Sequence, residues 1–122
     1  MLWKPTRSRS WNENWSRPLS GRRVQEVGSV SMVGVLRLRL RFPGCATLKD
    51  KRHIIHGLNQ RVRQTYAVAV AEVGELDRPA FCEVEIAGVA NERAHLHRVL
   101  TAVSRMYESR PELEVIDISM EV

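Results

Sequence analysis

The stretch VSMVGVLRLRLRFPG, from Val30 to Gly44, alternates apolar and basic side chains with a period of two. This period is typical of a β-strand that buries one face and exposes the other. Leucines and a phenylalanine occupy the face that must meet a core, and the opposite face carries Arg37, Arg39 and Arg41. The stretch therefore predicts a strand over Val33 to Phe42, which Pro43 and Gly44 terminate.

The rest of the chain alternates between the helical period and the strand period. Thr47 is a good N-cap for a first helix, and Asn91 is one for a second helix that should end before Pro111. The sequence predicts helices over 48–65 and 92–110, and strands over 67–73, 81–90 and 112–122. In the last strand, alternation places four residues toward the core: Ile116, Ile118, Met120 and Val122.

The predicted order is strand, helix, strand, strand, helix, strand. Each helix connects two strands of a β-α-β unit, and right-handed crossovers place both helices on the same face of the sheet. The expected fold class is α+β: a ferredoxin-like β-α-β-β-α-β sandwich with an antiparallel sheet in the order 4-1-3-2. One face of the sheet should be covered by helices and the other should be open.

The three arginines of the first strand should lie on that open face, between two strands that carry acids. The acids expected to bracket them are Glu83, Glu85, Asp117 and Glu121. Opposite charges on neighbouring strands attract by about 0.2 to 1 kcal/mol per pair, so we interpret the set as a structural charge ladder. RNA-binding sheets of similar topology carry aromatic residues at such positions, and none is expected here. A charged partner or a homodimer contact is the alternative.

The first 31 residues differ in composition from the remainder. They hold six basic and two acidic residues, hence +4 of the net charge of +5, and all three tryptophans, Trp3, Trp11 and Trp15. Ser, Arg, Pro and Gly dominate, which is typical of a segment that does not fold alone. We expect a disordered leader over 1–31 and one domain over 32–122. The leader could bind nucleic acid or act as a transit peptide, but we favour a start codon assigned too far upstream of Met32.

The start of the first helix is the candidate binding site. Basic residues crowd a helix end whose dipole favours anions, and exposed backbone N–H groups there can bind phosphate. The predicted phosphate-binding or RNA-binding residues are Thr47, Lys49, Lys51 and Arg52. The alternative is a solvated helix face on which Asp50 partly balances the charge.

Enzyme chemistry finds little support in the sequence. His53 and His56 share a helix face without a third ligand, so no metal site is expected. Cys45 has no partner placed to activate it, and Cys45 and Cys82 lack the spacing of a redox motif. We expect no catalytic residues and no cofactor. No apolar run approaches the roughly 20 residues of a membrane span, so a soluble, cytoplasmic protein is expected.

Three segments carry a resemblance to a known family: the LKDKR run at 48–52, the VAEVG end of the second strand, and the final strand after SRPE. With the alternating first strand, they resemble the DUF503 or YlxP-like family of small bacterial proteins, over residues 32–122. The resemblance implies a ferredoxin-like fold without an established activity. It also implies a ribosomal association, because such genes often lie near those for translation initiation and small-subunit maturation. Many relatives carry a longer, Trp-containing segment in place of GELDRPA.

The leading hypothesis is a non-enzymatic protein that binds RNA or the ribosome, with rRNA or the small ribosomal subunit as partner, through residues 47–52. The alternative is a homo-oligomeric interaction or structural module without a nucleic-acid role, which would meet itself through the open sheet face or an edge strand.

Overall fold

The computed structural model of the protein describes residues 31–122. The expected leader lies outside the described residues, apart from Ser31. The elements are β1 (Met32–Arg41), α2 (Leu48–Thr65), β2 (Ala69–Gly74), β3 (Phe81–Ala90), α3 (Arg93–Glu108) and β4 (Glu114–Glu121). This order is the β-α-β-β-α-β sequence that the alternating periods predicted.

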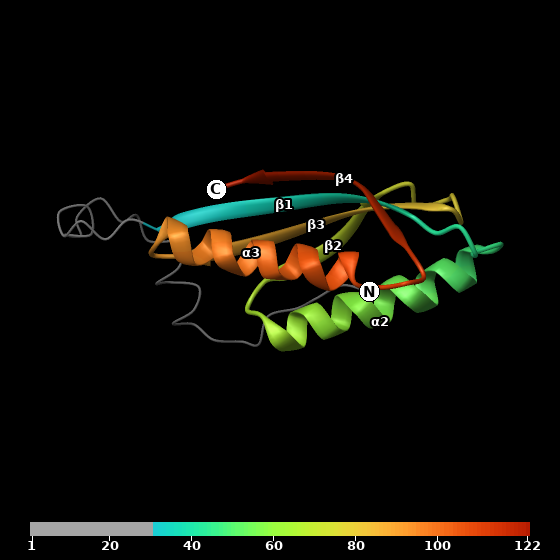
Figure 1. Cartoon of the computed structure of the whole chain (residues 1–122), viewed down its shortest axis with the longest axis horizontal. Coiled ribbons are helices and arrows are strands. Elements are labelled where there is room, and N and C mark those ends of the chain that lie inside the picture. The colour runs from blue at the N-terminus through green and yellow to red at the C-terminus, as the bar shows by residue number, and fades with distance from the viewer. Residues whose placement is uncertain (1–30) are drawn as a thin grey trace, which may run out of the picture. The chain divides into compact units, whose positions relative to one another are not determined.

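The four strands form one antiparallel sheet in the order β2-β3-β1-β4. Figure 1 shows α2 and α3 on the same side of this sheet, and within residues 31–122 no helix lies on the other side. The predicted ferredoxin-like α+β fold is therefore confirmed. No helix within 31–122 has the length and apolar character needed to cross a membrane.

The core lies between the sheet and the two helices. The leucines of β1 are fully buried, and they pack with residues from every other element. From the helices the core receives chiefly Ile55, Leu58, Val62, Leu96, Leu100, Val103 and Tyr107. Because β1 is a central strand, its leucine face meets both helices, and this fixes its arginine face on the open side.

Gly34 and Gly88 stand opposite each other on β1 and β3, beneath α3. A Cβ atom at Gly34 would lie 3.0 Å from side-chain atoms of Leu96 and of Leu100. One at Gly88 would lie 2.9 Å from Leu96. The missing side chains therefore allow α3 to approach the sheet closely.

Two local predictions at the second half of the domain were wrong. The N-cap of α3 is Glu92 rather than Asn91, and it makes no side-chain capping hydrogen bond. In β4, a bulge opposite Arg39 and Leu40 interrupts the alternation. Ile116 and Ile118, which were expected in the core, remain 45% and 43% exposed, because they lie on an edge strand that α3 covers only in part. Leu113 supplies the buried side chain there.

Candidate functional site

The loop before α2 and the first turn of the helix form the region where the sequence placed a binding site. Thr47 is the N-cap: its Oγ1 accepts a hydrogen bond of 3.1 Å from the backbone N–H of Asp50. Lys49 and Arg52 are exposed, and among residues 31–122 neither forms an ion pair. These two cations are available to a ligand.

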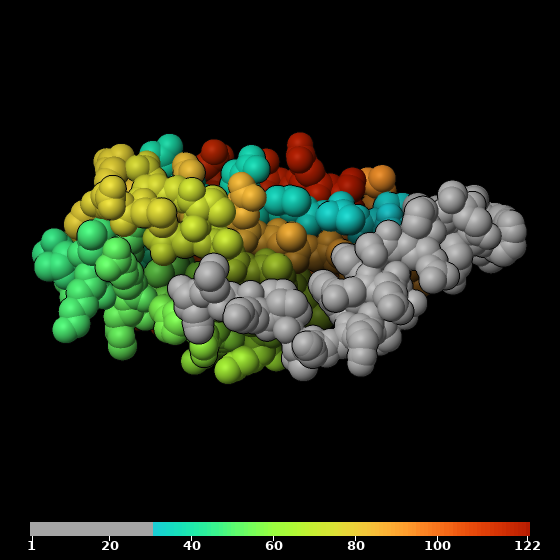
Figure 2. Space-filling model, turned by 180° about the vertical axis from the view of Figure 1, so that it is seen from behind, coloured from blue at the N-terminus to red at the C-terminus, as the bar shows by residue number. Residues whose placement is uncertain are grey.

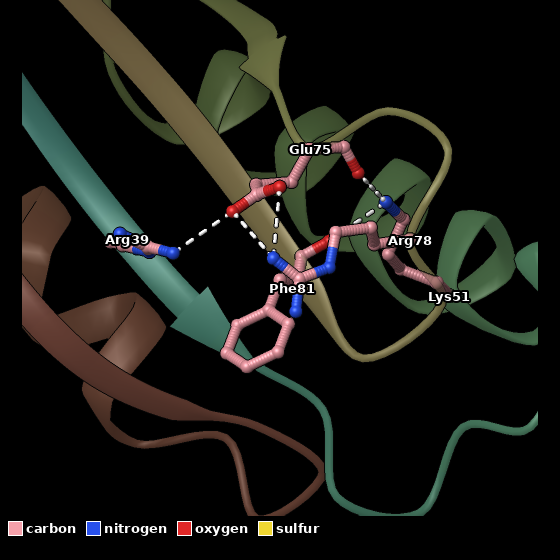
Figure 3. Close-up of polar contacts among 5 residues, drawn as sticks. All are labelled: Arg39, Lys51, Glu75, Arg78 and Phe81. Carbon is pink, nitrogen blue, oxygen red and sulfur yellow. Dashed lines mark hydrogen bonds and ion pairs between the residues drawn. The ribbon is translucent and has the colours of Figure 1, made fainter.

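Lys51 departs from this expectation, because its side chain is fully buried. Its Nζ donates hydrogen bonds of 2.8 Å to the carbonyl oxygens of Glu75 and Phe81, and lies 3.3 Å from Glu72 Oε2. Figure 3 shows the ammonium at the base of the loop between β2 and β3. All three donors of the ammonium have partners within the protein, so Lys51 cannot contribute to a phosphate site on the surface.

A sequence signal for this burial exists. The buried apolar residues of α2 are Ile55, Leu58 and Val62, and Lys51 stands one turn before Ile55 on the same stripe. A basic residue in the apolar stripe indicates a buried cation with dedicated partners. The partners themselves come from distant elements, so the sequence could not name them.

Glu72 links this buried cation to a thiol. The Sγ of Cys82 donates to Glu72 Oε2 at 3.4 Å, and Cys82 is fully buried. Burial, reinforced by the Glu72 carboxylate, raises the pKa of the Cys82 thiol well above its usual value. The pKa of the Cys45 thiol is also raised, by burial and by Asp50. Both thiols are therefore poor nucleophiles at neutral pH.

The arginine ladder takes partners that differ in part from those predicted. Arg37 Nε lies 2.7 Å from Glu85 Oε2, as the β1–β3 register indicates. Arg39 instead pairs with Glu75 at 2.9 Å, and Arg41 with Glu114 at 2.7 Å. Among the described residues, the other three predicted acids form no ion pair: Glu83, Asp117 and Glu121.

The conformation of Glu75 accounts for the pairing of Arg39 with Glu75 rather than with Glu83 or Asp117 on the neighbouring strands. Glu75 has a φ of 59°, in the left-handed region, and this turn aims its carboxylate at the open face of the sheet. There it meets both Arg39 and Arg78 (Figure 3). The guanidinium of Arg78 lies 4.3 Å from the centre of the Phe81 ring, a cation–π distance. The loop therefore folds over this end of the open face, where Arg78 covers Phe81, the one aromatic residue of β3.

The free cations lie on the outer face of α2 instead. A shallow groove of about 550 Å³ runs along it, and the groove is lined by Lys49, Arg52, His53, Ile55, His56, Asn59, Arg63 and Glu72. A second hollow of about 680 Å³ lies at the helix start and shares Lys49 and His53 with the first. Arg63 Nη2 donates a hydrogen bond of 2.8 Å to the carbonyl oxygen of Val70. This bond fixes the orientation of the guanidinium group, but a carbonyl oxygen does not neutralise its charge.

Charge is divided between the two layers of the domain. The helices α2 and α3 contain eight basic and two acidic residues, and the four strands contain three basic and six acidic residues. All four histidines are exposed on the helices. No group of three His, Cys, Asp or Glu side chains within the described part of the chain could hold a metal ion. The arrangement suits the binding of an anion by the helical layer.

Comparisons with known proteins place the chain in a family. No curated protein matches the chain. Among solved structures, a de novo designed protein, Foldit4, is 17% identical with a TM-score of 0.47, over 75% of this chain and 98% of its own. A family model described as "Protein of unknown function (DUF503)" matches residues 33–120. That match includes every residue of the six elements except Met32 and Glu121, and the chain belongs to the DUF503 family.

Proposed function

We propose that the protein binds RNA through the outer face of α2, as a non-enzymatic, cytoplasmic protein. The observation that carries the proposal is the stripe of exposed cations along that helix. Lys49, Arg52 and Arg63 lie on one face together with His53 and His56 and line one groove. At 1.5 Å per residue, this stripe extends about 21 Å, enough to follow several phosphates of one strand.

The contrast with the open sheet face supports this choice of surface. On the sheet each arginine has a carboxylate partner, and Phe81 is covered by Arg78. Within α2 the only acidic residue is Asp50, and Glu72 of β2, which also lines the groove, is paired with the buried Lys51. Phosphate contacts need cations that are not already neutralised, and in the part of the chain that the structure describes only the helical layer offers a row of them.

The RNA to be tested first is that of the small ribosomal subunit, because the family resemblance implies a link to its maturation. Affinity of the full chain for small-subunit rRNA is measured by fluorescence anisotropy over a series of salt concentrations. We expect log K to fall linearly with log salt, and Lys49→Glu with Arg52→Glu to weaken binding about tenfold or more and to flatten the slope by about 1 to 2.

The matched control is Arg98→Glu with Arg105→Glu, which changes the net charge equally but on α3. Both of these arginines are exposed and make no ion pair among the described residues. If the control loses as much affinity as the α2 variant, the binding is explained by the overall charge of the protein and not by a site on α2. Binding that does not respond to salt would contradict the proposal altogether.

A further inference from the structure

We propose that the open face of the sheet is the contact between two copies of this chain, related by a two-fold axis that runs parallel to the strands between β1 and β3. This surface lies on the side of the sheet away from α2, so the proposal is independent of RNA binding. Figure 2 views the molecule from behind, where atoms of β1 and β4 reach the surface.

One half of the open face is apolar, and no other part of residues 31–122 covers it. Val33 and Val89 face each other across β1 and β3 and are 61% and 69% exposed, the two most exposed large apolar residues within 31–122. Val35 and Ala87 are the next pair on the same face. β-Branched residues paired on two central strands are typical of a face that packs against another surface.

The other half of the face carries opposite charges in matching rows. β1 presents Arg37 and Arg39, and β3 presents Glu85 and Glu83 directly beside them. The proposed axis exchanges the two rows while keeping each residue at its own level along the strands. The partner's β3 therefore lies over this β1, so that valine meets valine or alanine and arginine meets glutamate at each level.

The available contacts permit such an exchange. The side chain of Arg37 is 56% exposed even though it pairs with Glu85, so it can reach a second carboxylate. Glu83 makes no ion pair among residues 31–122. Two twisted sheets that pack with aligned strands lie about 10 Å apart, a distance that an arginine and a glutamate can bridge together.

The edge strands are also compatible with this axis. It places β4 of one copy over β2 of the other. At the levels of Val35 and Arg37, β4 carries Glu121 and Ser119, and β2 carries only alanines at the same levels, Ala69 and Ala71. Larger side chains therefore meet small ones, and the two edges do not collide.

The size of the face sets the expected affinity. Four strands about 4.8 Å apart and six to ten residues long give a footprint of about 540 Å² per copy. Two copies then bury about 1,100 Å², close to the lower limit of specific interfaces, so dimerisation at micromolar concentrations is expected. Because Glu75 of the loop between β2 and β3 binds Arg39, Arg37 and Glu85 form the more accessible of the two charged levels that β1 and β3 share, and this pair provides the test.

The experiment is sedimentation equilibrium of the full chain at concentrations from about 1 to about 200 µM, a range that spans the affinity expected of such an interface. Arg37→Glu and Glu85→Arg each place like charges across the proposed axis and should weaken dimerisation about tenfold or more. When the two variants are mixed, every cross-axis contact again joins opposite charges, so a heterodimer with near wild-type affinity should form. An effect on folding alone would not be rescued by mixing.

The apolar half is tested separately with Val89→Asp, which should abolish the dimer. Its control is Ile118→Asp, because Ile118 is also partly exposed but lies in register with Leu38, on the helix side of the sheet. A wild-type protein that stays monomeric at the highest concentration overturns the proposal. So does a dimer that Ile118→Asp disrupts and Val89→Asp does not, or single charge variants that fail to associate on mixing.

Discussion

Lys51 determines how α2 is attached to the loop between β2 and β3. Its ammonium holds two carbonyl oxygens, of Glu75 and Phe81, and one carboxylate, of Glu72, with no exposure to solvent. Since an unpaired buried charge or carbonyl is costly, each of these groups depends on the others. The same loop residue, Glu75, then reaches Arg39 on the open face, so Lys51 also supports the geometry of the ladder.

Lys51→Met should therefore destabilise the fold by about 3 kcal/mol, because it leaves Glu72 and two carbonyl groups without their donor. Lys49→Met, two residues earlier and exposed, should change stability by no more than about 0.5 kcal/mol. Urea denaturation followed by circular dichroism measures both free energies of unfolding. Equal losses in the two variants would show that the buried ammonium contributes nothing particular.

For individual side chains, the sequence predicts the correct ion-pair partner where two strands pair without interruption. Arg37 and Glu85 meet because β1 and β3 pair without interruption, and alternation places both on one face. Arg39 pairs with Glu75 because Glu75, a loop residue, adopts a left-handed backbone conformation. No residue of the GELDRPA segment indicates that conformation from the sequence. Lys51 is buried rather than available to a ligand because it lies in the apolar stripe of α2 and its charge is neutralised by groups of distant elements.

Among the elements, α2 combines a well-formed start with a weak centre. Thr47 caps the helix through Asp50, and Thr47→Ala should cost about 1 kcal/mol of stability by leaving that N–H without its acceptor. Because the hydroxyl oxygen already serves the helix, the same change should leave RNA affinity nearly unaltered. Thermal denaturation and the anisotropy assay together check this. A large loss of affinity with unchanged stability would instead make Thr47 a ligand-binding residue.

Gly57 lowers the stability of α2 without serving the packing, whereas Gly34 is required by its close neighbours. A Cβ at Gly57 would meet nothing within 4 Å, so Gly57→Ala should stabilise the protein by about 0.5 to 1 kcal/mol through helix propensity. Gly34→Ala should destabilise it, because the added methyl would press on Leu96 and Leu100 of α3. Free energies of unfolding from urea titrations decide the signs, and a gain in both variants would contradict the close approach of α3 to the sheet.

The elements also show where periodicity stops being informative. The first strand and both helices follow their patterns, because each buries a continuous apolar stripe against the core. β4 carries an equally regular pattern, yet its isoleucines stay exposed. An edge strand has a neighbour on one side only, and a single bulge shifts which residues face inward. The pattern cannot reveal that α3 covers this edge strand only in part.

At the scale of the whole molecule, the two layers carry different charges and suit different partners. The helical layer has the unpaired cations, and the sheet has balanced rows of arginine and glutamate beside exposed valines. RNA on α2 and a second copy on the sheet would occupy opposite sides of one domain, so the two basic helices of a dimer would lie on its two outer faces. Dimerisation would then raise the affinity only for an RNA long enough to reach both faces.

Stability of the whole domain should fall in alkaline solution, because two buried groups resist ionisation. Burial raises the pKa of Cys82 above its ordinary 9.0 and that of Tyr107 above its ordinary 10.0. Tyr107 is fully buried and donates to Asn59 Oδ1 at 2.6 Å. Above pH 9.0 the unfolded chain therefore loses the Cys82 proton while the folded chain keeps it. The stability that these groups contribute is complete below pH 9.0 and declines as the pH rises further.

Each group steepens this decline by up to about 1.4 kcal/mol per pH unit once the unfolded chain titrates. Cys82→Ala is less stable than the wild type at pH 7 because it leaves a cavity, but its free energy of unfolding should fall less between about pH 8.5 and about pH 10.5. Urea titrations of both proteins at several pH values measure the difference. Parallel curves would mean that the Cys82 thiol ionises as readily in the folded chain as in the unfolded one, and that its contact with Glu72 is not maintained in solution.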